Sequence, residues 1–123
     1  YFDNGNCLAY NIIEDSITKY LNDENRLDNY LFGNKAVSHI RWNGDFITHL
    51  ELLHNISKSY KKEIITSIQI VGNNLNKLSV EKTIERIDDG FDNSLANYTL
   101  SLKRKELMVK LLEKRIDRLL SSF

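Results

Sequence analysis

Three histidines within sixteen residues are the side chains whose type and spacing first suggest chemistry, because imidazole is a common zinc ligand. The neighbours that could supply a fourth ligand are Asp45, Glu51 and Cys7. Two ligands on one helix should be four residues apart, so that both point to the same side. His49 and His54 are five apart and would point about 140° from each other, while His39 lies further upstream. The spacing therefore argues against a metal site, and we expect histidines that are partly exposed.

Catalysis by a cysteine or by paired carboxylates has equally little support. Cys7 is the single cysteine, and no glycine-rich strand–turn–helix motif surrounds it. The adjacent acids Glu14 and Asp15 would diverge by about 100° on a helix and would not share a proton, and the same holds for Asp88 and Asp89. The sequence also lacks a Walker loop and a G-x-G-x-x-G nucleotide motif. We therefore expect a protein that is not an enzyme and that uses no cofactor or metal.

Any site must be positioned by a chain of 123 residues, which is enough for one domain. Hydrophobic residues make up 41% of it, so a core can form, and no apolar run approaches the roughly 20 residues that span a membrane. Proline is absent, which permits long uninterrupted helices. We expect a single helical domain over residues 1–123. Because the first residue is Tyr1 rather than Met, we also expect a fragment or a processed product.

Charge is balanced in total but segregated along the chain. The 17 basic and 17 acidic residues exclude attachment to nucleic acid or membrane by bulk positive charge. The net charge alternates between successive segments: −4 over residues 1–32, +3 over 33–80, −3 over 81–92 and +4 over 93–123. This alternation suits segments that fold back on one another with opposite charges facing. The same alternation would also let two copies of the chain pair.

A long helix is predicted in the middle of the chain. From Phe46 to Val71 the apolar positions step by three or four residues, which indicates one buried helix face over 46–71. Asn43 and Gly44 precede this helix and favour positive φ, so they predict a sharp corner beside Trp42.

The segment after this helix has a competing interpretation. Within residues 67–80, two short runs flank Gly72-Asn73-Asn74 in a pattern that is also typical of a β-hairpin. We expect helix through Val71, and a further helix for which Ser79 is the predicted N-cap. Near the N-terminus, Asp23 is predicted to cap a short helix that Gly33 closes.

The most regular pattern lies at the C-terminus, where nine positions step strictly by three and four residues. These positions are Leu95, Tyr98, Leu102, Lys105, Val109, Leu112, Ile116, Leu119 and Phe123. Such heptad spacing predicts one helix over 93–121, which is longer than the compact remainder of the chain would cover. We therefore predict that this helix carries an interaction surface. Its residues would be Lys105, Leu112, Ile116, Leu119 and Phe123.

The predicted fold class is all-α, an antiparallel bundle of four to five helices with a long C-terminal helix. The apolar faces of these helices define the expected core. Its members are Ile13, Ile17, Leu27, Leu31, Ile40, Trp42, Phe46, Leu50, Leu53, Tyr60, Ile64, Ile68, Ile84, Ile87, Phe91, Leu102, Val109, Leu112, Ile116 and Leu119.

The function that these features favour is a non-enzymatic protein–protein interaction module: an adaptor, assembly or inhibitor domain that uses a helical surface. Its partner would be another protein or a second copy of the chain, bound through the C-terminal helix, and no membrane would be involved. The alternative is a helical nucleic-acid-associated domain that uses the basic region 103–118. Acidic residues interrupt that region and no aromatic residue lies among its bases, which makes the alternative weaker.

Overall fold

The computed structural model describes residues 9–123 and confirms the all-α prediction. The helices are α1 (Ile17–Leu21), α2 (Glu24–Phe32), α3 (His49–Asn74), α4 (Lys77–Glu85) and α5 (Leu102–Ser122), with 3-10 helices η2 (Glu14–Ser16) and η3 (Asn93–Tyr98). The described residues contain no β-strand, only isolated bridges between Val37 and Thr48 and between Trp42 and Asp45.

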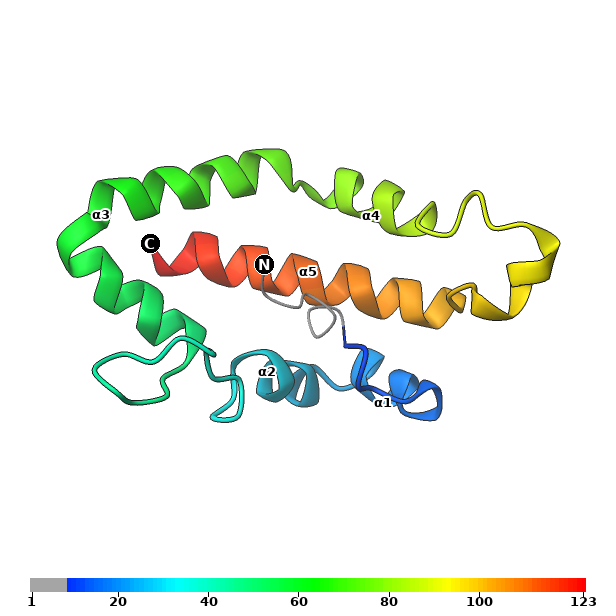
Figure 1. Cartoon of the computed structure of the whole chain (residues 1–123), viewed down its shortest axis with the longest axis horizontal. Helices are drawn as coiled ribbons and strands as arrows, with labels where there is room; N and C mark the ends of the chain where they lie inside the picture. The colour runs from blue at the N-terminus through cyan, green and yellow to red at the C-terminus, as the bar shows by residue number, and fades with distance from the viewer. Residues whose placement is uncertain (1–8) are drawn as a thin grey trace.

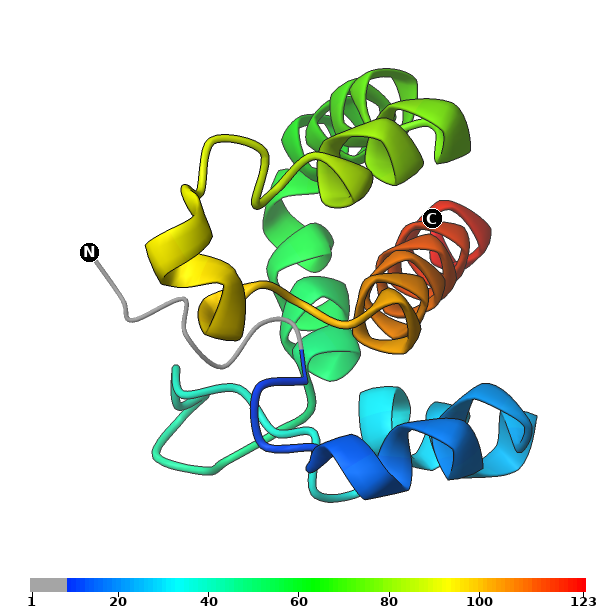
Figure 2. The same ribbon diagram turned by 90° about the vertical axis from the view of Figure 1, so that its right-hand side faces the viewer.

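Helix α5 is the centre of the molecule, with the other helices arranged around it. Figure 1 shows α4 and the second half of α3 along one side of α5, and α1 and α2 along the other, while the first half of α3 crosses beside the C-terminal end of α5. Figure 2, viewed along the molecule, shows the same layers end-on. Toward α1 and α2, Leu107 and Leu111 are completely buried in one apolar cluster with Ile17 and Leu27. Toward α4, Met108 packs with Val80 and Ile84 in a second cluster.

The helix starts follow from local capping chemistry. The side chain of Asp23 accepts a hydrogen bond from Arg26 N at the start of α2, as predicted. Thr48 and Glu51 form a capping box at the start of α3, which explains why this helix begins at His49. At α4 the N-cap is Asn76 rather than Ser79, because Asn76 Oδ1 accepts from the Ser79 backbone N–H.

The predicted helix over 93–121 is shorter than expected. Residues 93–98 form η3 instead, capped by Asp92, and Ser101 then starts α5 by accepting from Arg104 N. The capping residues therefore divide the predicted helix, although the three-and-four spacing of apolar residues continues across them. The first part of the predicted seam is exposed in consequence, and Leu102, predicted as core, is 84% exposed.

Helix α3 covers residues 49–71 of the predicted 46–71 helix, starting three residues later than expected, and it bends at Tyr60, where φ is −129° and ψ is 44°. The bend turns Tyr60 outward, so this residue is exposed and its assignment to the core is wrong. The alternative hairpin over 67–80 is also wrong, because α3 continues as a helix to Asn74. Gly72 allows a close approach to α5, since a Cβ there would lie 2.8 Å from a methyl group of Leu120.

The loop before α3 contains the predicted corner. Asn43 and Gly44 have φ values of 51° and 91°, and Trp42 and Asp45 exchange backbone hydrogen bonds across them. Trp42 is only partly buried, whereas Ile40 and Phe46 are exposed and were wrongly assigned to the core. Their loop extends from the bundle, and the Arg41 guanidinium lies 4.2 Å from the centre of the Phe46 ring.

The other predicted core residues fall into three groups according to their burial. Buried as predicted are Ile17, Leu27, Leu31, Ile68 and Ile84. Partly buried are Leu50, Leu53, Ile64, Val109, Leu112, Ile116 and Leu119. Exposed, against prediction, are Ile13, Ile87 and Phe91, because they lie in the turns before α1 and after α4 rather than on a packed helix face.

Candidate functional site

The chain exposes more surface than its mass requires. Its accessible area is 9136 Å², about a third more than the roughly 6,800 Å² expected for a compact monomer of 14.4 kDa. Exposed large apolar side chains gather in the segment that joins α4 to α5. They are Ile87, Phe91, Leu95, Tyr98 and Leu102. An apolar surface of this kind indicates a place where a partner could bind.

A groove of about 530 Å³ runs between α4 and α5 and begins at this exposed segment. Its apolar lining comes from Ile84 of α4 and from Leu102 and Val109 of α5. Four glutamates also line it. They are Glu81 and Glu85 of α4, and Glu106 and Glu113 of α5. The groove therefore combines an apolar surface with carboxylates on both of its walls.

Two lysines line the same groove, but both are neutralised within the chain. Lys105 pairs with Asp88, and their side chains are only 15% and 11% exposed. This pairing, with a hydrogen bond from Leu100 N, lowers the pKa of the Asp88 carboxyl. Lys110 Nζ lies 2.5 Å from Glu24 Oε1 and also donates to the Leu21 carbonyl.

Glu85 and Glu106, in contrast, make no ion pair within residues 9–123. One stands on each wall of the groove, and both are exposed. With the lysines already paired, Glu85 and Glu106 add unpaired negative charge to the two walls.

A second hollow, of about 220 Å³, continues along α5 and is lined by Leu75, Glu113, Ile116 and Asp117. α4 has nine residues and α5 has 21, and beyond α4 the end of α3 covers α5, with Gly72 close to Leu120. The hollow lies between α3 and α5, at Leu75, the C-cap residue of α3.

The five predicted interaction residues all lie on α5 or at its end, and each also contacts the rest of the chain or is partly buried. Lys105 is held by Asp88, while Leu112 and Ile116 pack against the Val80 cluster. The ring centres of Phe123 and His54 are 4.8 Å apart, and Leu119 is partly buried. Only Lys105 and Ile116 line the hollows. An interaction role for the five residues stays a prediction.

The wall residues Glu85 and Glu106 were not among those predicted from the sequence. The acidic segment 81–92, whose net charge is −3, is a signal for Glu85 alone. That signal does not say which carboxylates stay unpaired. Asp88 of the same segment is used by Lys105, whereas Glu85 is left beside the groove.

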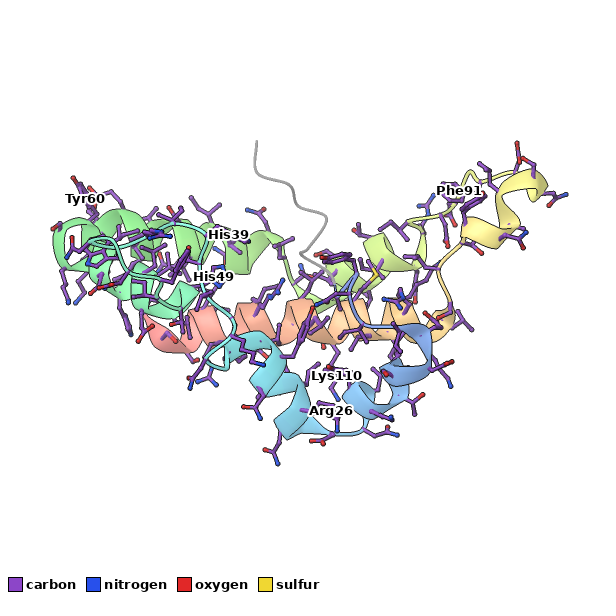
Figure 3. All side chains as sticks on the ribbon, turned by 60° about the horizontal axis from the view of Figure 1, so that its bottom comes forward. Arg26, His39, His49, Tyr60, Phe91 and Lys110 are labelled. Carbon is purple, nitrogen blue, oxygen red and sulfur yellow. The ribbon has the colours of Figure 1, made fainter. Side chains whose placement is uncertain are left out.

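The basic region 103–118 is engaged with the N-terminal layer of the bundle. Arg104 donates to the carbonyls of Ala9 and Ile12 at 3.0 and 2.6 Å, and Lys114 Nζ lies 2.7 Å from Asp28 Oδ1. Lys110 and Lys114 together, mainly through their hydrogen bonds, lower the pKa of Glu24 to about 2. Figure 3 labels Lys110 and Arg26 on the side of the molecule that α1 and α2 cover.

The histidines do not converge on a common site. His39 and His49 are exposed, while His54 lies against Phe123. Among residues 9–123, no three His, Cys, Asp or Glu side chains are placed so that they could hold a metal ion. Cys7 lies outside the described residues.

Comparison with known protein families, with curated proteins and with solved structures finds no match to this chain. Within the described part of the chain, no helix is long and apolar enough to cross a bilayer.

Proposed function

We propose that this chain is a non-enzymatic protein-interaction module that binds a helical segment of its partner in the groove between α4 and α5. The observation that carries the proposal is the pair of walls, in which Glu85 and Glu106 flank the apolar side chains of Ile84 and Val109. A partner helix with an apolar stripe bordered by lysine or arginine matches that arrangement. Burying the stripe would drive binding, and the carboxylates would select its orientation.

The alternative of nucleic-acid binding has less support, because it needs the basic side chains of α5 to be available for phosphates. Arg104, Lys110 and Lys114 instead make ion pairs and hydrogen bonds with the first 28 residues. Detaching them would break contacts that join the two halves of the bundle. The carboxylates of the neighbouring groove would also repel a phosphate backbone.

The proposal is tested with a fluorescein-labelled amphipathic helix made of leucine and lysine. The control peptide has the same composition, with its leucines scattered around the helix. Fluorescence anisotropy should show saturable binding of the first peptide and at least about tenfold weaker binding of the second.

The matched variants remove two exposed carboxylates each. Glu85→Gln with Glu106→Gln should weaken binding of the amphipathic peptide by about tenfold or more, since both walls lose their charge. Asp15→Asn with Asp45→Asn should leave the affinity unchanged, because neither residue lines the groove. Equal affinities for both peptides, or equal losses in both variants, would contradict the proposal.

A further inference from the structure

We propose that the segment that occupies this groove is the bend of α3 from a second copy of the chain, so that two copies form a reciprocal pair. This inference rests on the proposed function in placing the partner in the groove, and the partner segment then offers one aromatic ring, Tyr60, flanked by lysines in place of a full apolar stripe. The bend is defined here as residues 58–63, which surround the non-helical Tyr60.

The bend projects from the molecule. All six of its residues are exposed, whereas a straight helix packed along one side would turn some of them inward. Tyr60 is 60% exposed at its tip. Figure 3 shows Tyr60 at one end of the molecule and Phe91 near the other, where the groove begins.

The charge of the bend is the opposite of that of the groove. Lys58, Lys61 and Lys62 outnumber its single acid, Glu63. Lys61 and Lys62 make no ion pair within residues 9–123, just as Glu85 and Glu106 make none. Unpaired lysines on one surface and unpaired carboxylates on another are complementary when two copies meet.

The side chains of the bend and of the groove are also chemically complementary. Tyr60 combines an apolar ring with a polar hydroxyl, and tyrosine is among the residues enriched in the centres of interfaces. The groove offers it Ile84, Leu102 and Val109 as an apolar lining. Lysines on either side of the ring would face the glutamates on the walls.

Two copies placed antiparallel would bring each bend to the groove of the other. Such a pair is closed by a two-fold axis and buries two equal contacts, which is the commonest arrangement of soluble homo-oligomers. A stable interface needs about 800 Å² from each partner, so both contacts of the pair must form together.

The test uses two sets of charge reversals. The groove variant carries Glu85→Lys and Glu106→Lys, and the bend variant carries Lys61→Glu and Lys62→Glu. In the groove variant both surfaces are positive, and in the bend variant both are negative. Neither variant should therefore pair with itself, but an equimolar mixture restores both contacts. Circular dichroism of each variant checks that it has folded.

Sedimentation velocity should give a wild-type mass that rises from 14.4 kDa toward twice that value between about 1 μM and 1 mM, the range in which weak pairs dissociate. Each variant alone should stay at 14.4 kDa, and the mixture should again reach twice that mass. Tyr60→Ala should weaken pairing, whereas Tyr10→Ala, which removes another exposed tyrosine, should not.

Three results would overturn the inference: a monomeric wild type over the whole range, pairing that both variants retain, or a mixture that stays monomeric. A wild-type mass that grows beyond two chains would overturn the closed pair. If the wild type is monomeric but the leucine–lysine peptide still binds the groove, the proposed function stands and only the identity of its partner is wrong. If the peptide also fails to bind, both proposals fail.

Discussion

Arg104 Nη2 lies 2.9 Å from Glu14 Oε2, which joins residues that are 90 positions apart in the chain. The same guanidinium donates to two backbone carbonyls of the N-terminal segment, at Ala9 and Ile12. One side chain of α5 thus holds the loop that leads into α1. Basic residues of the last segment face acidic residues of the first, as the alternation of charge along the sequence predicts.

Replacement of Arg104 by alanine should destabilise the fold by about 2–3 kcal/mol, because its side chain is 16% exposed and two carbonyls would lose their donor. Urea denaturation followed by circular dichroism measures the change. The control is Arg86→Ala, which breaks an exposed pair with Asp89 and should cost much less than Arg104→Ala. Similar losses in both variants would mean that the Arg104 contacts do not hold the layers together.

Stability should fall in acid, and Glu24 should contribute to the fall. Its folded pKa of about 2 lies below the value of roughly 4.3 expected in the unfolded chain. Its stabilising effect is therefore complete above that unfolded value and is lost as the pH falls toward 2. Glu24→Gln should lower the urea midpoint at pH 7 and reduce the difference between pH 7 and pH 3. Asp15→Asn, which removes an exposed carboxylate, serves as the control, and an unchanged pH dependence in Glu24→Gln would contradict the assignment.

Two leucine-to-alanine variants compare the buried face of α5 with its exposed face. Leu111→Ala should cost about 2–5 kcal/mol, because Leu111 is completely buried between α5 and the N-terminal helices. Leu102→Ala should cost less than about 0.5 kcal/mol, because this side chain is 84% exposed. Thermal or urea unfolding compares the two variants. A large loss at Leu102 would show that α5 is packed in the register that the heptad pattern suggested.

Retention on a heparin column addresses the nucleic-acid alternative. With its basic residues engaged, the chain should elute below about 0.2 M NaCl. Glu14→Gln with Glu24→Gln releases Arg104 and Lys110 from their carboxylates and should increase retention. Strong retention of the wild type, beyond about 0.5 M NaCl, would favour nucleic-acid binding instead.

The sequence predicted the helical class because apolar spacing and capping residues agree over most of the chain. Asp23 starts α2, and the Asn43-Gly44 corner precedes α3, both as expected. Where apolar spacing and capping residues disagree, the capping residues determine where the helices begin. The three-and-four rhythm runs from Leu95 through Leu102 without a break, yet Asp92 and Ser101 divide that stretch into η3 and α5.

The core and the groove depend on packing that spacing does not reveal. A helix covered on one side buries one seam, but α5 is covered on both sides, so Leu107 and Leu111 are buried although they lie off the predicted seam. The residues Glu85 and Glu106 come to face one groove only through the way α4 lies along α5. Which carboxylates remain unpaired follows from tertiary contacts such as that between Lys105 and Asp88.

The most direct test of groove binding is a titration of the isotope-labelled protein with the leucine–lysine peptide, followed by the chemical shifts of its backbone amides. The largest changes should fall on the groove, at Ile84, Glu85, Leu102, Glu106 and Val109, while α1 and α2 should change little. Changes centred on α1 and α2, or no changes at peptide concentrations that saturate the anisotropy signal, would contradict groove binding.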